Sequence, residues 1–212
     1  MAALQRQLLQ YASRILGHYE PNQEQLDFFY SLLPLKSHDE LAPSDHIAVL
    51  HSQIEVALQD PDQDKLADCP APREVQEVFC LDEHALELIL FCYCCVQHAP
   101  FADYCSSIPK SESFRFLALC TALDPAQLNR LLSPRGPLLG PGILESNPHD
   151  GWCLQLNPEL VDFLAGIAGC SLAELYCRRV SGSTYPLDSF PVPPIDLYIL
   201  NSLLRNCQQI TE

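Results

Sequence analysis

Four residues near the middle of the chain have the chemistry of a zinc site. Cys92, Cys94, Cys95 and His98 lie close together in the sequence, and zinc prefers thiolate sulfur and imidazole nitrogen as ligands. In a helix, Cys92 and Cys95 would be neighbours at a spacing of three residues, and Cys94 and His98 at a spacing of four. Structural zinc sites usually draw on two separated pairs of ligands, whereas these four side chains would point around most of one helix. The pattern therefore favours buried free thiols over a metal site.

The chain contains 11 cysteines, an odd number. Most occupy apolar positions of helix-like stretches, where a thiol packs as a small hydrophobic group. The N-terminus lacks the layout of a signal peptide, and the longest apolar run is far below the roughly 20 residues that span a bilayer. A nucleophilic cysteine needs a base and an electropositive site, and nothing in the sequence singles one out. We therefore expect a soluble, cytoplasmic protein with reduced cysteines and no membrane contact.

Other catalytic and ligand-binding patterns are absent or incomplete. Asp60, Asp62 and Asp64 alternate as in a calcium-binding loop, but Lys65 and Ala71 stand where that loop needs glycine and glutamate. None of the three lysines follows a glycine, so the phosphate-binding loop of nucleotide hydrolases is missing. The glycine-rich dinucleotide motif, the zinc-protease motif and the nucleophile elbow are also missing. The sequence thus predicts no enzymatic activity, no catalytic residue, no cofactor and no metal ligand.

The charge of the chain favours protein partners. It has 27 acidic and 12 basic residues, a formal net charge of −15. Residues 1–110 carry 17 acidic and 6 basic side chains, and residues 111–212 carry 10 and 6. Such a field repels phosphate backbones and anionic lipid headgroups, so nucleic acid is disfavoured as a partner.

The elements that would position these residues are mostly helices. Through residues 1–110, apolar side chains recur every three or four positions, which predicts an acidic helical domain. Ser44 and Asp82 have the residue types of N-caps. The predicted helices cover about residues 4–17, 21–33, 45–59, 74–79 and 82–98. Residues 59–73 are acidic and rich in proline, and they predict an exposed loop before the fourth helix.

Residues 111–164 have the order of a winged-helix module. A helix opening at Ser111 is followed by a short helix, which Asp124 would cap ahead of Pro125. Glycines and prolines over residues 136–142 then interrupt any helix, and two short strands flank the turn SNPHD. Those strands are predicted near residues 143–145 and 152–156, and Asn157–Pro158 begins a further helix.

Such a module binds either nucleic acid or protein. Residues 125–132 would form the recognition helix for DNA. The polar residues available for contact there and in the wing are Gln127, Asn129, Arg130, Arg135 and His149. Two arginines beside an acidic wing would hold phosphate poorly, because affinity for DNA rests on several cationic contacts. Protein docking or packing is therefore favoured, with DNA binding as the alternative.

The same region resembles a known protein family. The run ALCTALDPAQLNRLLSPRGPLLGPGILE, followed by LNPELVDFLAG, is similar to a segment upstream of the ATPase module in certain bacterial AAA-type ATPases. The resemblance covers about residues 113–168, and the family's nucleotide-binding module has no counterpart in this sequence. It implies an adaptor or substrate-recognition domain acting on an ATPase ring, either as the N-terminal region of such a protein or as a standalone relative. It does not imply ATP hydrolysis by this chain.

Together these patterns predict a mainly α fold. Residues 1–110 would form the helical acidic domain and residues 111–180 the winged-helix-like module with its short β-hairpin. Residues 181–194 would be a linker, and residues 195–212 a C-terminal helix. The expected function is non-catalytic protein interaction or substrate recognition, with an ATPase module, a substrate or an adaptor as the partner.

Overall fold

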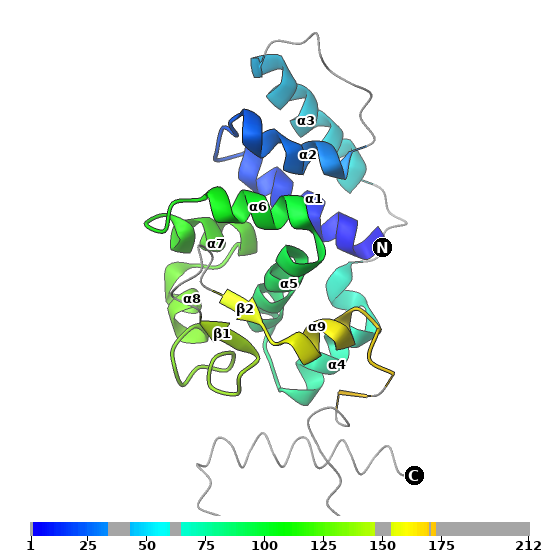
Figure 1. Cartoon of the computed structure of the whole chain (residues 1–212), viewed down its shortest axis with the longest axis vertical. Coiled ribbons are helices and arrows are strands. Elements are labelled where there is room, and N and C mark those ends of the chain that lie inside the picture. Colours follow the sequence, from blue (N-terminus) through cyan, green and yellow to red (C-terminus); the bar gives the residue numbers. More distant parts are fainter. Residues whose placement is uncertain (1, 34–42, 60–64, 147–153, 170, 173–212) are drawn as a thin grey trace, which may run out of the picture.

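The computed structural model describes residues 2–33, 43–59, 65–146, 154–169 and 171–172. They are mainly helical, with one two-stranded antiparallel sheet, which confirms the predicted fold class (Figure 1). The α-helices are α1 (Ala2–Leu16), α2 (Leu26–Leu32), α3 (Pro43–Leu58), α4 (Pro70–Val78), α5 (Glu83–Gln97), α6 (Ala99–Ser107), α7 (Ser113–Thr121), α8 (Pro125–Leu131) and α9 (Pro158–Leu164). The strands are β1 (Leu144–Ser146) and β2 (Leu154–Leu156), and short 3₁₀ turns cover Gln23–Gln25 and Leu66–Asp68.

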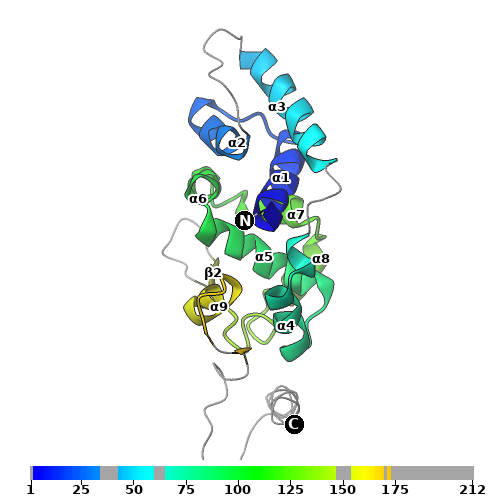
Figure 2. The ribbon, with the colours of Figure 1, turned by 90° about the vertical axis from the view of Figure 1, so that its right-hand side faces the viewer.

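Helix α5 is the centre of the molecule. It packs against α1, α4, α6, α7, α9 and strand β2, and both views place it between the upper helices and the hairpin (Figures 1 and 2). Asp82 caps it as predicted, because the Asp82 side chain accepts a hydrogen bond from the amide of Ala85 at 2.8 Å. The helix is apolar on nearly every side, and its residues 88–94 are all buried.

Helices α5 and α6 meet at a bend of 108°. His98 ends α5 in an extended backbone conformation and also caps α6, where its Nδ1 accepts from the amide of Phe101 at 3.2 Å. Pro100 lies in the first turn of α6, where its missing N–H is not needed. No single helix among the described residues is long and apolar enough to cross a membrane, and only this bent pair, taken together, meets that test by length and composition.

An aromatic cluster joins the two halves of the sequence. Tyr11 stacks on Phe101 with ring centroids 5.7 Å apart, and Phe28 lies 4.9 Å from the same ring. Across the predicted boundary at residue 110, Phe116 of α7 stacks against Tyr104 of α6 at 5.9 Å. Buried residues from both sides of that boundary belong to one hydrophobic core.

The order of elements predicted for the winged-helix-like module is present. Helix α7 ends at Thr121, the next residue Ala122 adopts the left-handed conformation (φ 55°), and α8 begins at Pro125. Strands β1 and β2 pair with Leu144 opposite Leu156, and both side chains are buried. Asn157 caps α9 as predicted, its side chain accepting from the amide of Glu159.

The sequence-based prediction was wrong at several helix starts: α2 begins at Leu26 after a 3₁₀ turn rather than at residue 21, and α7 begins at Ser113 rather than at Ser111. Helix α4 begins at Pro70 rather than near residue 74, and Leu66 within the predicted exposed loop is buried. Helix α3 begins at Pro43, so Ser44 lies inside the helix rather than capping it. Helices α3 and α4 both open on proline, whose fixed φ suits a first helical position. The hairpin turn after residue 146, the predicted linker at 181–194 and the predicted helix at 195–212 lie outside the described residues.

Candidate functional site

The predicted recognition helix directs part of its polar side toward the protein itself. Arg130 of α8 donates from Nη2 to Oδ2 of Asp82 at 2.6 Å. The other carboxylate oxygen of Asp82 accepts the capping hydrogen bond of α5. One carboxylate therefore fixes the start of α5 and holds α8 beside it.

Gln127 makes a second link between the same helices. Its Oε1 accepts from the amide of Asp124 at 2.9 Å, while Asp124 accepts from the amide of Gln127, which forms a capping box. The side-chain nitrogen of Gln127, Nε2, can only donate, and it lies 2.9 Å from Nε2 of His84. In this arrangement Nε2 of His84 is the acceptor.

The remaining predicted contact residues are not gathered with these two. Asn129 and Arg135 are exposed, Asn129 on α8 and Arg135 just beyond its end. His149 lies outside the described residues. The sequence indicated which side chains α8 would carry, but Asp82 and His84 were not predicted as their partners, since they lie more than 40 positions earlier and the pairing depends on tertiary packing.

The four residues weighed as zinc ligands do not form one site. Cys92 and Cys94 are buried, and burial raises the pKa of both thiols well above its usual value. Sγ of Cys95 lies 3.8 Å from Sγ of Cys105, and His98 caps α6. Within the described part of the chain, no group of three or more histidine, cysteine, aspartate or glutamate side chains is placed to hold a metal ion.

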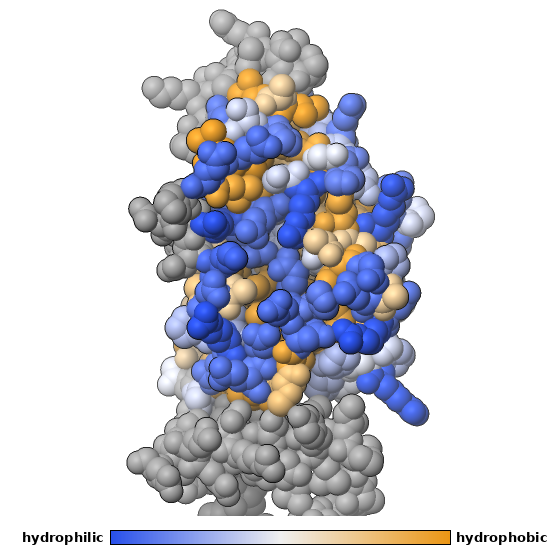
Figure 3. Space-filling view, turned by 180° about the vertical axis from the view of Figure 1, so that it is seen from behind, coloured by the Kyte–Doolittle hydropathy of each residue, from blue (hydrophilic) through white to orange (hydrophobic). Residues whose placement is uncertain are grey.

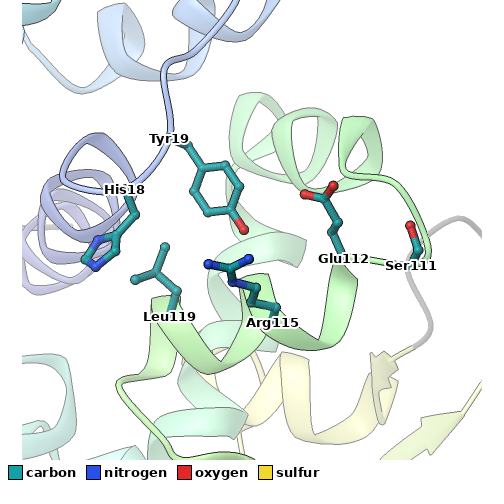
Figure 4. A pocket seen from close by; sticks show the side chains of 6 residues that line it. All are labelled: His18, Tyr19, Ser111, Glu112, Arg115 and Leu119. Atoms are coloured by element: carbon teal, nitrogen blue, oxygen red, sulfur yellow. The ribbon is translucent and has the colours of Figure 1, made fainter.

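An open hollow of about 360 Å³ lies between the end of α1 and the start of α7 (Figure 4). Sequence reasoning did not find it, because its two sides come from distant segments. Its lining residues are His18, Tyr19, Ser111, Glu112, Arg115 and Leu119. The hydroxyl of Tyr19 and the guanidinium of Arg115 point toward each other from the two sides of the hollow (Figure 4). This pair could hold a carboxylate, but the residues that line the hollow include no hydrogen-bonded pair of nucleophile and base.

A charged network links α1 to α5 and α7. Arg14 lies 3.3 Å from Oε1 of Glu87 and also donates to the carbonyl of Cys120. Gln7 lies 3.4 Å from each carboxylate oxygen of Glu87. Burial raises the pKa of Glu87, and the guanidinium of Arg14 offsets only part of that shift. We assign this network a structural role, because it joins three helices across the core.

Comparisons with known proteins give no relative. No protein-family model matches the chain, and no curated protein or solved structure matches it either. The residues themselves therefore carry the functional argument.

Proposed function

We propose that this chain is a non-catalytic protein-interaction or substrate-recognition domain that acts with an AAA-type ATPase. The observation that carries the proposal is the position of α8. Its Arg130 is paired with Asp82 and its Gln127 with His84. To enter a major groove with these residues, the helix would have to leave both partners. Gln127 and Arg130 thus hold α8 against the start of α5, and they are not available to read DNA.

The electrostatics of this surface support a protein partner. Asp82 neutralises Arg130, and Glu83 and Asp124 add negative charge at the starts of α5 and α8. With a net charge of −15 for the chain, a DNA backbone would meet repulsion rather than the several cationic contacts it needs. A protein partner, which does not need a row of cationic contacts, fits this surface better than DNA does.

The partner surface would be polar. The exposed large hydrophobic side chains among the described residues are Val56, Val96, Phe114 and Ile167, and they belong to four different segments. Seen from behind, the surface is mostly hydrophilic and its apolar areas are separated (Figure 3). Many docking sites are large apolar patches, and the described residues form none on this surface. We therefore expect hydrogen bonds and charge to dominate the contact with the partner. Asn129 and Arg135 are the outward-facing candidates.

A two-arm binding experiment tests the proposal. The labelled full chain is titrated by fluorescence anisotropy with a purified AAA-type ATPase module from the same organism, and separately with mixed-sequence duplex DNA at low salt. We expect saturable binding to the ATPase module and none to the duplex at micromolar protein. The double variant Asn129→Ala/Arg135→Glu should weaken binding to the module by about tenfold, the scale of one or two lost polar contacts.

The control is Arg73→Glu, which makes the same charge change on α4, outside the module, and should bind as the unaltered chain does. Absence of binding to the ATPase module would contradict the proposed association. Duplex binding that falls steeply with salt and is lost in Arg135→Glu would establish the DNA-binding alternative instead.

A further inference from the structure

Two thiols face each other across the bend between α5 and α6. Cys95 lies in the last turn of α5 and Cys105 near the end of α6, and their sulfur atoms are 3.8 Å apart. A disulfide bond is about 2.05 Å long, so a shift of less than 2 Å between the sulfurs would join them. The sequence pattern did not predict that Cys95 and Cys105 lie next to each other.

The two thiols differ in their access to solvent. Cys105 is 1 % exposed, whereas Cys95 is partly exposed. Burial, together with the neighbouring Cys95 thiol, raises the pKa of Cys105. A small oxidant in solution would therefore react first at Cys95, with Cys105 held next to it as the resolving thiol.

Other cysteines near this pair are worse placed. Cys92 and Cys94 are buried in α5, and Cys120 is buried in α7. Among the described cysteines, Cys95 and Cys105 form the one thiol–thiol contact within hydrogen-bond distance. The geometry therefore selects one pairing from several conceivable ones.

We propose that Cys95 and Cys105 form a reversible intramolecular disulfide in response to hydrogen peroxide. In the first step, the Cys95 sulfur attacks one peroxide oxygen, the O–O bond breaks, and Cys95 becomes a sulfenic acid while water leaves. In the second step, the Cys105 sulfur attacks the Cys95 sulfur. The S–O bond breaks, and the hydroxyl leaves as water with the Cys105 proton. Two thiols thus supply the two electrons that reduce one hydrogen peroxide to two waters.

The disulfide would link the end of α5 to α6 across the bend at His98. This inference does not depend on the proposed function, because it concerns only the chemistry of two neighbouring thiols. Reduction by a dithiol restores the open pair, since thiolates exchange with disulfides.

Mass spectrometry of the full chain tests the pairing. The protein is reduced, desalted without oxygen, treated with hydrogen peroxide, alkylated and digested with chymotrypsin without reduction. Cleavage after Phe101 and Tyr104 separates peptide 94–101 from peptide 105–114. We expect these two peptides to be linked, with a mass loss of about 2 Da for the lost thiol hydrogens. Dithiothreitol should release them, and fragmentation should place the link at Cys95.

Two variants complete the test. Cys95→Ser changes a partly exposed side chain, so the protein should fold, as circular dichroism would show, but the linked pair should disappear. Cys69→Ser alters another partly exposed cysteine and should leave the link intact. The proposal is overturned if Cys95 forms a disulfide with Cys92 or Cys120. It is also overturned if Cys95 is oxidised to sulfinic acid while Cys105 remains a thiol.

Discussion

Glu87 shows how a single residue makes stability depend on pH. Its side chain is 21 % exposed and contacts Arg14 and Gln7. Burial disfavours the charged carboxylate more than the guanidinium of Arg14 favours it, so the pKa rises from its ordinary value of 4.5. The folded protein therefore holds a proton on Glu87 at pH values where the unfolded chain has released it.

The first prediction follows from this difference. The contribution of Glu87 to the free energy of unfolding is largest below pH 4.5 and declines as the pH rises through the raised pKa. The side chain of Glu87→Gln cannot ionise. The difference in free energy of unfolding, unaltered protein minus variant, should therefore fall as the pH rises through this window. Urea unfolding at a series of pH values measures it. The exposed Glu77→Gln should give a smaller slope, and a rising difference for Glu87→Gln would show that the ion pair with Arg14 outweighs burial.

At the scale of elements, Asp82 has two separable roles. One oxygen caps α5 and the other pairs with Arg130 of α8. Asp82→Asn keeps a capping oxygen but loses the charge, and should cost less than about 1 kcal/mol because both side chains of the ion pair are about half exposed. Asp82→Ala also removes the cap and should cost about 1 kcal/mol more.

Chemical unfolding of the two Asp82 variants at low and high salt tests this separation. Salt should shrink the cost of Asp82→Asn, since it screens the ion pair, and leave the extra cost of Asp82→Ala nearly unchanged. Asp103→Ala, an exposed aspartate within α6, serves as the control and should change stability little. Equal costs for Asp82→Asn and Asp82→Ala would mean that the capping hydrogen bond contributes nothing.

The elements that the sequence predicted well are those with local signals. Asp124–Pro125 and Asn157–Pro158 place an N-cap before a proline, and both helices start there. The start of α4 was missed because Pro70 and Pro72 are typical of loops as well as of first helical turns. The pairing of Arg130 with Asp82 spans 48 residues, and no local pattern encodes such a contact. The contact of Cys95 with Cys105 was likewise missed, because it depends on the bend at His98.

At the scale of the whole molecule, side-chain packing continues across residue 110, where the sequence predicts a domain boundary. Phe116 of α7 is fully buried between Tyr104 of α6 and Tyr19, which follows α1. Strand β2 and helix α9 pack on α5. A core shared in this way couples the stability of the first helices to that of the winged-helix-like module.

This coupling gives the last prediction. Phe116→Ala removes a buried ring and should lower the free energy of unfolding by about 3–5 kcal/mol. Because the core is continuous, far-ultraviolet circular dichroism, which reports all helices, and the near-ultraviolet signal of the tyrosines should still change together in one transition at lower denaturant. Phe114 lies on the same helix, but its side chain is 39 % exposed. Phe114→Ala should therefore lower the free energy of unfolding far less. Independent domains would behave differently: Phe116→Ala would split the transition and leave the helices of residues 1–110 with their original midpoint, because Phe116 would then support only its own module.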